Sequence, residues 1–83
     1  MKISLITVSL NSQDTILYTF NSVLTQSYKN IEHVIVDGGS EDATIELIKD
    51  YPLKNKKVFF KKNFKLYQSL NYAIKNSTGD YIL

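Results

Sequence analysis

The sequence predicts an α/β fold of three layers, in the order β-α-β-α-β-α-β, with a mostly parallel sheet. Short β-branched apolar runs alternate with segments whose apolar residues recur at helical spacing. The run Ile35-Val36-Asp37 stops at a carboxylate, and Gly38-Gly39-Ser40 leads from it into helix-forming residues. This order is typical of a parallel strand that ends at a ligand crevice. The 83 residues are 43% hydrophobic, which is enough for the core of one small domain.

The first 25 residues predict one strand and one helix. The strand covers Lys2 to Ser9, and Asn11 or Ser12 is the expected N-cap of the helix that follows. The apolar residues of this helix fall on one stripe with the spacing i, i+1, i+4, i+7 and i+8. They are Ile16, Leu17, Phe20, Val23 and Leu24.

Residues 31–52 predict the second strand and helix. The strand covers Ile31 to Val36, and the helix begins near Ser40 to Asp42, where two acidic residues suit the positive end of the helix dipole. Its core-facing side chains are expected to be Ile45 and Ile48, with Leu47 at the edge. Tyr51-Pro52 ends the helix, because a residue that precedes proline avoids the helical region.

The last third predicts a short strand, a helix and the beginning of a fourth strand. Val58 to Phe60 is the strand, and it is flanked by lysines. The expected apolar stripe of the helix consists of Leu66, Leu70, Ala73 and Ile74. Asn76 to Gly79 breaks this helix, and Asp80 to Leu83 reads as strand again.

The net charge of +2 conceals two oppositely charged parts. Residues 1–51 hold three lysines against seven acids, whereas residues 52–83 hold seven lysines against Asp80 alone. We favour the interpretation that the lysines of residues 52–83 are solvated and protect an edge strand against pairing with other chains. Nucleic-acid binding is not expected, because the lysines accompany no nucleic-acid module. Contact with an anionic membrane surface remains open.

Several chemistries are excluded or disfavoured. The chain has no cysteine, no apolar run of membrane-spanning length and neither of the glycine-rich phosphate-binding fingerprints. We expect a cytoplasmic chain, with membrane association still open. His33 lies within the second strand and is expected to pack rather than to act as a base. Glu41 and Asp42 are expected to complement the helix dipole.

Asp37 permits two interpretations of equal weight by its position alone. It can close a turn through hydrogen bonds to the following backbone, or it can face a ligand. Thr7, Ser9 and Asn11 favour a ligand, because they end the strand expected to lie beside that of Asp37. Two neighbouring strand ends would then present small polar groups to one crevice.

At this level of detail the chain resembles the N-terminal part of family 2 glycosyltransferases, which have the GT-A (Rossmann-like) fold. Four stretches carry the resemblance, in order and with family-like spacing. They are Ile3 to Ser12, Ser22 to Glu32, Val34 to Thr44, and Leu66 to Asn71 followed by Thr78 to Leu83. Residues 1–83 would then be a single domain, the N-terminal part of a GT-A glycosyltransferase domain.

The resemblance implies a binding site for a nucleotide-diphosphosugar donor, most often a UDP-sugar. The strand end that follows the nucleotide corresponds to Thr7, Val8, Ser9 and Asn11. Asp37 would contact the base, with Gly38, Gly39 and Ser40 shaping the wall. A carboxylate accepts the imide N–H of uracil and discriminates against cytosine, whose N3 carries no proton. Asn71 matches an asparagine of the third helix and is included as a binding residue.

The chain also departs from the family pattern. Leu10 stands where an aromatic residue usually stacks on the base, and Lys61 to Lys65 replaces a stretch with an acidic residue and a glycine. These lysines could instead meet a pyrophosphate. The metal-binding Asp-x-Asp and the catalytic base of the family lie beyond Leu83. We therefore expect no catalytic or metal-binding residue in this chain, and Mg or Mn only in a complete family member.

The sequence also permits comparison with two other function classes, an interaction module and a phosphoacceptor. A non-catalytic interaction or dimerisation module would use the open sheet edge to pair with a second copy. A receiver-like phosphoacceptor at Asp37 is disfavoured, because Ser9-Leu10-Asn11 offers no acidic pair.

Overall fold

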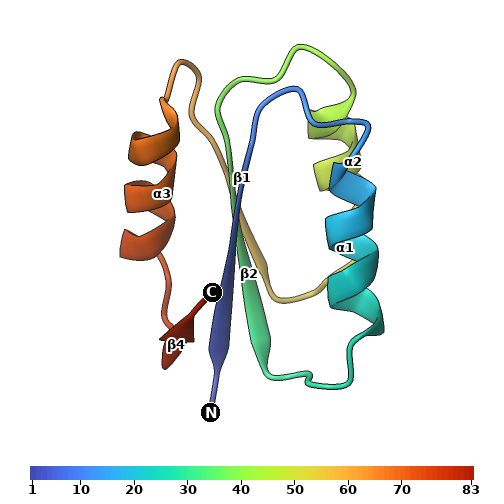
Figure 1. Ribbon diagram of the computed structural model, residues 1–83, viewed down its shortest axis with the longest axis vertical. Coiled ribbons are helices and arrows are strands. Elements are labelled where there is room, and N and C mark those ends of the chain that lie inside the picture. Colours follow the sequence, from blue (N-terminus) through green and yellow to red (C-terminus); the bar gives the residue numbers. More distant parts are fainter.

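The computed structural model describes residues 1–83 and contains four strands and three helices (Figure 1). The elements are β1 (Ile3–Ser9), α1 (Ile16–Thr25), β2 (Ile31–Asp37), α2 (Thr44–Asp50), β3 (Lys56–Phe60), α3 (Leu66–Lys75) and β4 (Tyr81–Ile82). The strands lie in the order β3-β2-β1-β4, and each neighbouring pair is parallel. The predicted alternation is confirmed, and the fourth strand lies beside the first.

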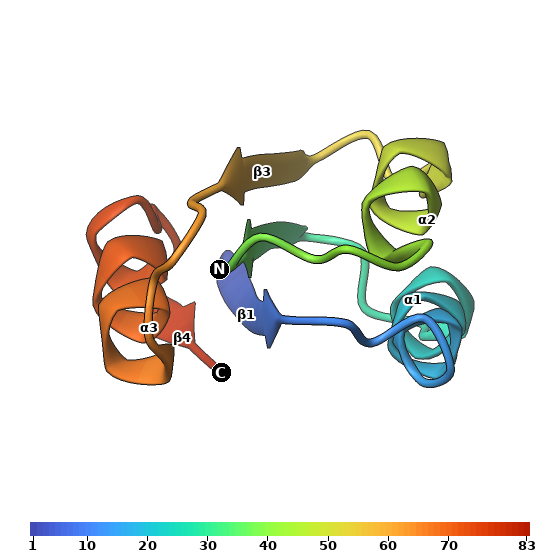
Figure 2. The ribbon, with the colours of Figure 1, turned by 90° about the horizontal axis from the view of Figure 1, so that it is seen from above.

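Figure 2 shows the three predicted layers, with α1 and α2 on one face of the sheet and α3 on the other. The core therefore has two parts. Between the sheet and the α1–α2 layer, the buried side chains are Ile16, Phe20, Ile35, Ile48 and Tyr51. Under α3, the buried side chains are Val34, Val36 and Ala73. All seven residues of β2 are buried, because this strand lies between β1 and β3 with helices on both faces.

The first helix begins later than predicted, and neither Asn11 nor Ser12 is its N-cap. Thr15 occupies that position and makes no capping hydrogen bond with its side chain. The side chains of the expected caps are engaged elsewhere. The Asn11 side-chain oxygen accepts the N–H of Glu41 (2.8 Å), and the Ser12 hydroxyl donates to the Leu10 carbonyl oxygen (3.3 Å). Leu17 is 48% exposed and does not belong to the buried stripe.

The second helix also begins later, at Thr44. The Asp42 carboxylate accepts the N–H of Thr44 (2.9 Å), so the predicted stabilisation of the helix start by an acid is confirmed for this residue. Hydrogen bonds, foremost that from the Thr44 hydroxyl, lower the pKa of Asp42. Thr44 and Ile48, one helical turn apart, are buried, whereas Ile45 is only half-buried. The helix ends before Tyr51-Pro52, as predicted.

The predicted core stripe of the third helix is wrong in three of its four residues. Ala73 is buried, but Leu66 is 65%, Leu70 38% and Ile74 49% exposed. Ser69 and Ala73, four residues apart, form the buried face instead. Small side chains there let the helix approach the sheet closely, and the larger apolar side chains turn away from it.

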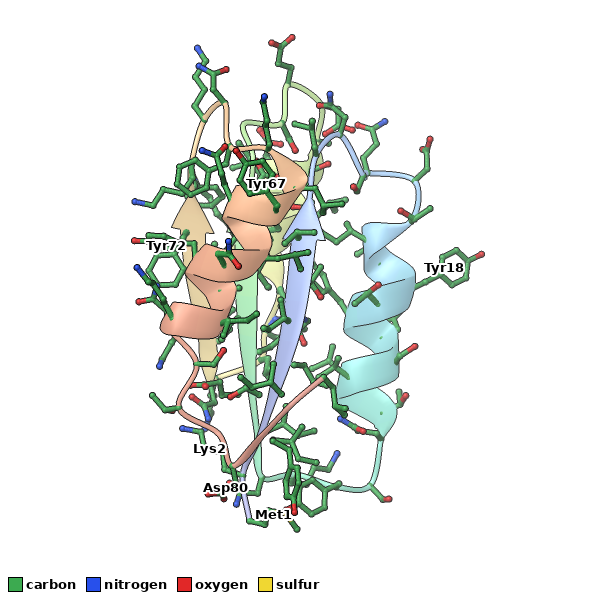
Figure 3. All side chains as sticks on the ribbon, turned by 60° about the vertical axis from the view of Figure 1, so that its left-hand side comes forward. Met1, Lys2, Tyr18, Tyr67, Tyr72 and Asp80 are labelled. Atoms are coloured by element: carbon green, nitrogen blue, oxygen red, sulfur yellow. The ribbon has the colours of Figure 1, made fainter.

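A buried carboxylate links the strands at the amino edge of the sheet. Glu32 accepts hydrogen bonds from the Ser4 hydroxyl (2.5 Å) and the Thr78 N–H (2.7 Å) and forms an ion pair with Lys57 (3.0 Å). Burial opposes its ionisation, but these bonds prevail and lower the pKa of Glu32 to about 2. The cluster fixes the turn before β4. Figure 3 shows Lys2 and Asp80 beside each other at this edge.

The expectation of solvated lysines fails for two residues of the edge strand β3. Lys56 donates from its ammonium group to the carbonyl oxygens of Ile48 (3.1 Å) and Tyr51, at the end of α2. Lys57 donates to the Asn76 carbonyl oxygen (3.0 Å) in addition to its ion pair. Both lysines are therefore part of the structure. No helix of the chain has the length and apolar character needed to cross a membrane.

Candidate functional site

Asp37, the last residue of β2, is completely buried and organises the carboxyl edge of the sheet. One carboxylate oxygen accepts the hydroxyls of Ser9 (2.8 Å) and Ser40 (2.6 Å). The other accepts the N–H groups of Gly39 (3.0 Å) and Ser40 (2.8 Å). Four donors match the usual capacity of a carboxylate. Of the two interpretations of Asp37, the hydrogen-bonded turn is therefore formed. A ligand that binds this carboxylate would have to replace one of the four donors.

Asn11 joins the end of β1 to the segment before α2. Its N–H donates to the Ser40 hydroxyl (2.8 Å), and its side-chain oxygen accepts the N–H of Glu41 (2.8 Å). Its backbone is in the left-handed region, with a φ of 50°, which asparagine tolerates better than most residues. Ser9, Asn11, Asp37 and Ser40 thus form one connected polar cluster, which we call the strand-end cluster.

A hollow of about 150 Å³ opens beside the strand-end cluster. One wall comes from the end of β1 and from Gly38, and the other from the start of α3. The lining residues are Val8, Ser9, Leu10, Gly38, Phe64, Leu66 and Ser69. A Cβ atom at Gly38 would lie 3.2 Å from the carbonyl oxygen of Phe64, so a larger residue would narrow this opening.

The loop between β3 and α3 is fastened to the glycine turn by its backbone. The Lys61 N–H donates to the Asp37 carbonyl oxygen (2.8 Å), and the Asn63 N–H donates to the Gly38 carbonyl oxygen (3.1 Å). Gly39 has a φ of +103°, and a Cβ there would lie 3.2 Å from the Cα of Lys62. Residues 61–65, which we call the lysine loop, are thereby held against the strand-end cluster.

Thr7 is half-buried on the sheet face that α1 and α2 cover. Its hydroxyl is 2.8 Å from Nε2 of His33, whose Nδ1 is 2.9 Å from the Tyr51 hydroxyl. Burial lowers the pKa of His33 to about 4 and raises the pKa of Tyr51 to about 12. His33 is neutral near pH 7 and packs in the core, as predicted. Thr7 is held by this chain of hydrogen bonds rather than by the strand-end cluster.

Asn71 is separate from the other predicted site residues. It is exposed on α3 and lines another hollow, of about 230 Å³, with Phe64, Gln68, Tyr72 and Lys75. Figure 3 shows Tyr72 on the side of α3 that faces β3. Phe64 borders both hollows, but Asn71 does not line the one beside Asp37.

The sequence interpretation did not include Phe64, Leu66 and Ser69 as site residues. One signal was present, because loops that follow neighbouring parallel strands meet at the same edge of a sheet. The loop after β3 therefore had to lie near that after β2. No three histidine, aspartate or glutamate side chains gather in a way that could hold a metal ion.

The chain is similar to known glycosyltransferases in sequence. Residues 4–83 match the profile of the family described as glycosyl transferase family 2. The chain is 36% identical over 85 residues to the putative glycosyltransferase EpsE of Bacillus subtilis, covering 98% of this chain and 31% of EpsE. It is 36% identical over 83 residues to the Escherichia coli UDP-Glc:alpha-D-GlcNAc-diphosphoundecaprenol beta-1,3-glucosyltransferase WfaP, covering 96% of this chain and 32% of WfaP.

The fold is similar to that of a solved structure. The crystal structure of S. aureus TarS superposes with a TM-score of 0.89 at 32% identity, covering 100% of this chain and 16% of TarS. The chain thus spans less than a third of the length of each of these relatives.

Proposed function

We propose, since the chain belongs to glycosyl transferase family 2, that it forms the nucleotide-binding part of an enzyme that uses a nucleotide-diphosphosugar donor. UDP is the nucleotide that the site suits best. Transfer of the sugar to an acceptor is assigned to the longer protein, because the relatives extend well beyond the matched region.

The strand-end cluster beside the hollow carries this proposal. Asp37 ends β2 at the carboxyl edge of the parallel sheet, the edge at which α/β proteins bind ligands. Its carboxylate can accept the uracil N3–H in place of a serine hydroxyl, which can rotate to another acceptor. Leu10, 57% exposed at the rim, can cover the base. The name of the E. coli relative includes a UDP-sugar, which supports the same nucleotide class.

Sugar transfer requires more groups than we assign to residues 1–83. A cation must neutralise the diphosphate leaving group, and a base must take the proton of the acceptor hydroxyl. His33 cannot act as that base, because it is buried and bonded to Thr7 and Tyr51. We propose that Mg or Mn and the catalytic base belong to a complete family member.

An amide NMR titration of the 83-residue chain with UDP tests this function. We expect shifts at residues 7–11, 37–40 and the lining of the hollow, with CDP binding more weakly than UDP. Dispersed spectra without shifts on addition of UDP, with or without manganese, would contradict nucleotide binding.

Asp37→Asn tests the role of the carboxylate. The amide keeps one acceptor oxygen for the turn but presents an N–H₂ donor in place of the second. We expect the affinity for UDP to fall about tenfold, and the preference for UDP over CDP to decrease, because the N3 of cytosine accepts a hydrogen bond. Asp50→Asn, an exposed acid at the end of α2, is the control with the same change of charge. An unchanged ratio of UDP to CDP affinity would refute the assignment of the base to Asp37.

The exposed apolar surface favours a second candidate, an interaction module that pairs through the edge of β4. Large apolar side chains are exposed on α3 and beyond it. They are Leu66, Leu70, Ile74, Tyr81, Ile82 and Leu83. Sedimentation over a range of concentrations distinguishes this candidate, because a monomer at every concentration excludes self-pairing.

A further inference from the structure

The lysine loop holds two cations that no other group of the chain neutralises. Lys62 and Lys65 are exposed, and neither side chain forms an ion pair. Both ion pairs of the structure belong to Glu32, which binds Lys2 and Lys57. Near the loop, the Asp37 carboxylate is buried and already accepts four hydrogen bonds.

The neighbouring lysines have structural contacts, which sets Lys62 and Lys65 apart. Lys56 binds carbonyl oxygens at the end of α2, and Lys57 binds Glu32. The ammonium group of Lys61 lies 4.6 Å from the centre of the Tyr72 ring. Among the three lysines of the loop, Lys62 and Lys65 make no ion pair and no contact with an aromatic ring.

The backbone of the loop places these two cations beside the candidate nucleotide site. Lys62 packs on Gly39 of the strand-end cluster's turn, where a Cβ would be only 3.2 Å from its Cα. Lys65 lies between Phe64 and Leu66, both of which line the hollow of about 150 Å³. The Lys65 N–H donates to the side-chain oxygen of Gln68 (2.8 Å), which fixes the loop at the start of α3.

We propose that Lys62 and Lys65 bind the diphosphate of the nucleotide. Their ammonium groups would neutralise the negative charge of the diphosphate within the part of the site that residues 1–83 form. The inference rests on the proposed function, because it assigns a second group of the same ligand. A lysine ammonium binds phosphate as a point charge and can follow a mobile ligand.

The test compares uridine with UDP on the 83-residue chain, in EDTA, by amide NMR titration. Lys62→Gln/Lys65→Gln is the test variant. We expect its affinity for UDP to be about tenfold lower than that of the wild type, with the affinity for uridine unchanged. Raising the salt concentration should weaken UDP binding to the wild type more than to the variant.

Lys29→Gln/Lys54→Gln is the matched control. It removes the same charge from exposed lysines that border a hollow at the opposite edge of the sheet. The control should bind UDP like the wild type. Equal losses in both variants would indicate a general effect of net charge and would overturn the proposal, as would UDP binding that Lys62→Gln/Lys65→Gln leaves unchanged.

Pyrophosphate separates failure of this inference from failure of the proposed function. If uridine does not bind but UDP and pyrophosphate both shift residues 61–66 in a lysine-dependent way, the nucleotide assignment is wrong and the anion site is supported. If uridine binds and the phosphates add nothing to affinity, the nucleotide assignment holds and the lysine assignment is overturned.

Discussion

Asp37 combines a structural task with a place in the strand-end cluster, which borders the candidate site. Its carboxylate holds Ser9, Gly39 and Ser40 and thereby sets the shape of the glycine turn. The sequence could predict that Ser9 and Asp37 meet, because both end neighbouring parallel strands. It could not predict that four donors converge on Asp37, since that depends on the path of the turn after it. For Asn71, the sequence could predict a place in a helix. It could not predict on which side of that helix the residue lies.

His33 gives a pH dependence to stability at the scale of one residue. Its pKa is about 4 in the folded chain and 6.5 without burial, so the unfolded chain binds more protons between these values. The free energy of unfolding should therefore fall as the pH decreases from 6.5 towards 4. The full loss is on the order of 3 kcal/mol. Urea unfolding at about pH 7 and about pH 5 measures the larger part of this loss, about 2 kcal/mol.

His33→Gln provides the comparison for this effect. The variant should be less stable than the wild type near neutral pH, because the packing of His33 is lost. Since glutamine does not titrate, its free energy of unfolding should depend less on pH above pH 5. An equally steep decrease in the variant would mean that other groups cause the effect.

At the scale of elements, the helices could be predicted more reliably than their buried faces. The periodicity of Leu66, Leu70 and Ile74 predicted α3 correctly, since the spacing depends only on the helix itself. Their exposure could not be predicted, because the buried face is decided by how closely the helix approaches the sheet. Ser69 and Ala73 permit the close approach, and apolar character alone does not show this.

Gly79 controls the pairing of β4. A Cβ there would lie 2.5 Å from the Ser4 hydroxyl oxygen and 2.7 Å from the Ser4 backbone nitrogen, and the strand backbone cannot give way. Gly79→Ala should displace the turn that Glu32 holds and separate β4 from β1. We expect a loss of about 1–3 kcal/mol in the free energy of unfolding. Faster hydrogen exchange should appear at the Ile6 amide, which donates to Leu83 (2.9 Å).

Ser77→Ala is the control for this substitution. It lies in the same connection and removes one hydroxyl that donates to the Ala73 carbonyl (2.7 Å), without adding an atom near Ser4. Its Ile6 amide should exchange like that of the wild type. Unchanged protection of Ile6 in Gly79→Ala would show that the turn can absorb a side chain.

At the scale of the whole molecule, β4 is an edge strand beside an uncovered apolar surface. Surfaces of this kind promote association. We expect the 83-residue chain to self-associate as its concentration increases, and Leu70→Lys/Ile74→Lys to shift it towards the monomer. Sedimentation velocity measures both effects.

Leu17→Lys on α1 is the matched control, because Leu17 is also about half exposed but belongs to the opposite layer. It should associate like the wild type. Association that survives the double substitution on α3 would move the contact surface away from that helix.

The anchoring of the amino terminus has a practical consequence. The Met1 carbonyl oxygen accepts hydrogen bonds from the side chains of Tyr28 and Asn30 (2.8 Å for Asn30), at the edge of the sheet remote from Asp37 (Figures 1 and 3). A fluorophore or a surface linker attached at this end would therefore point away from the crevice. Immobilised molecules would all present the same face to the solution, so the chain is suited to surface-based measurement of weak ligands.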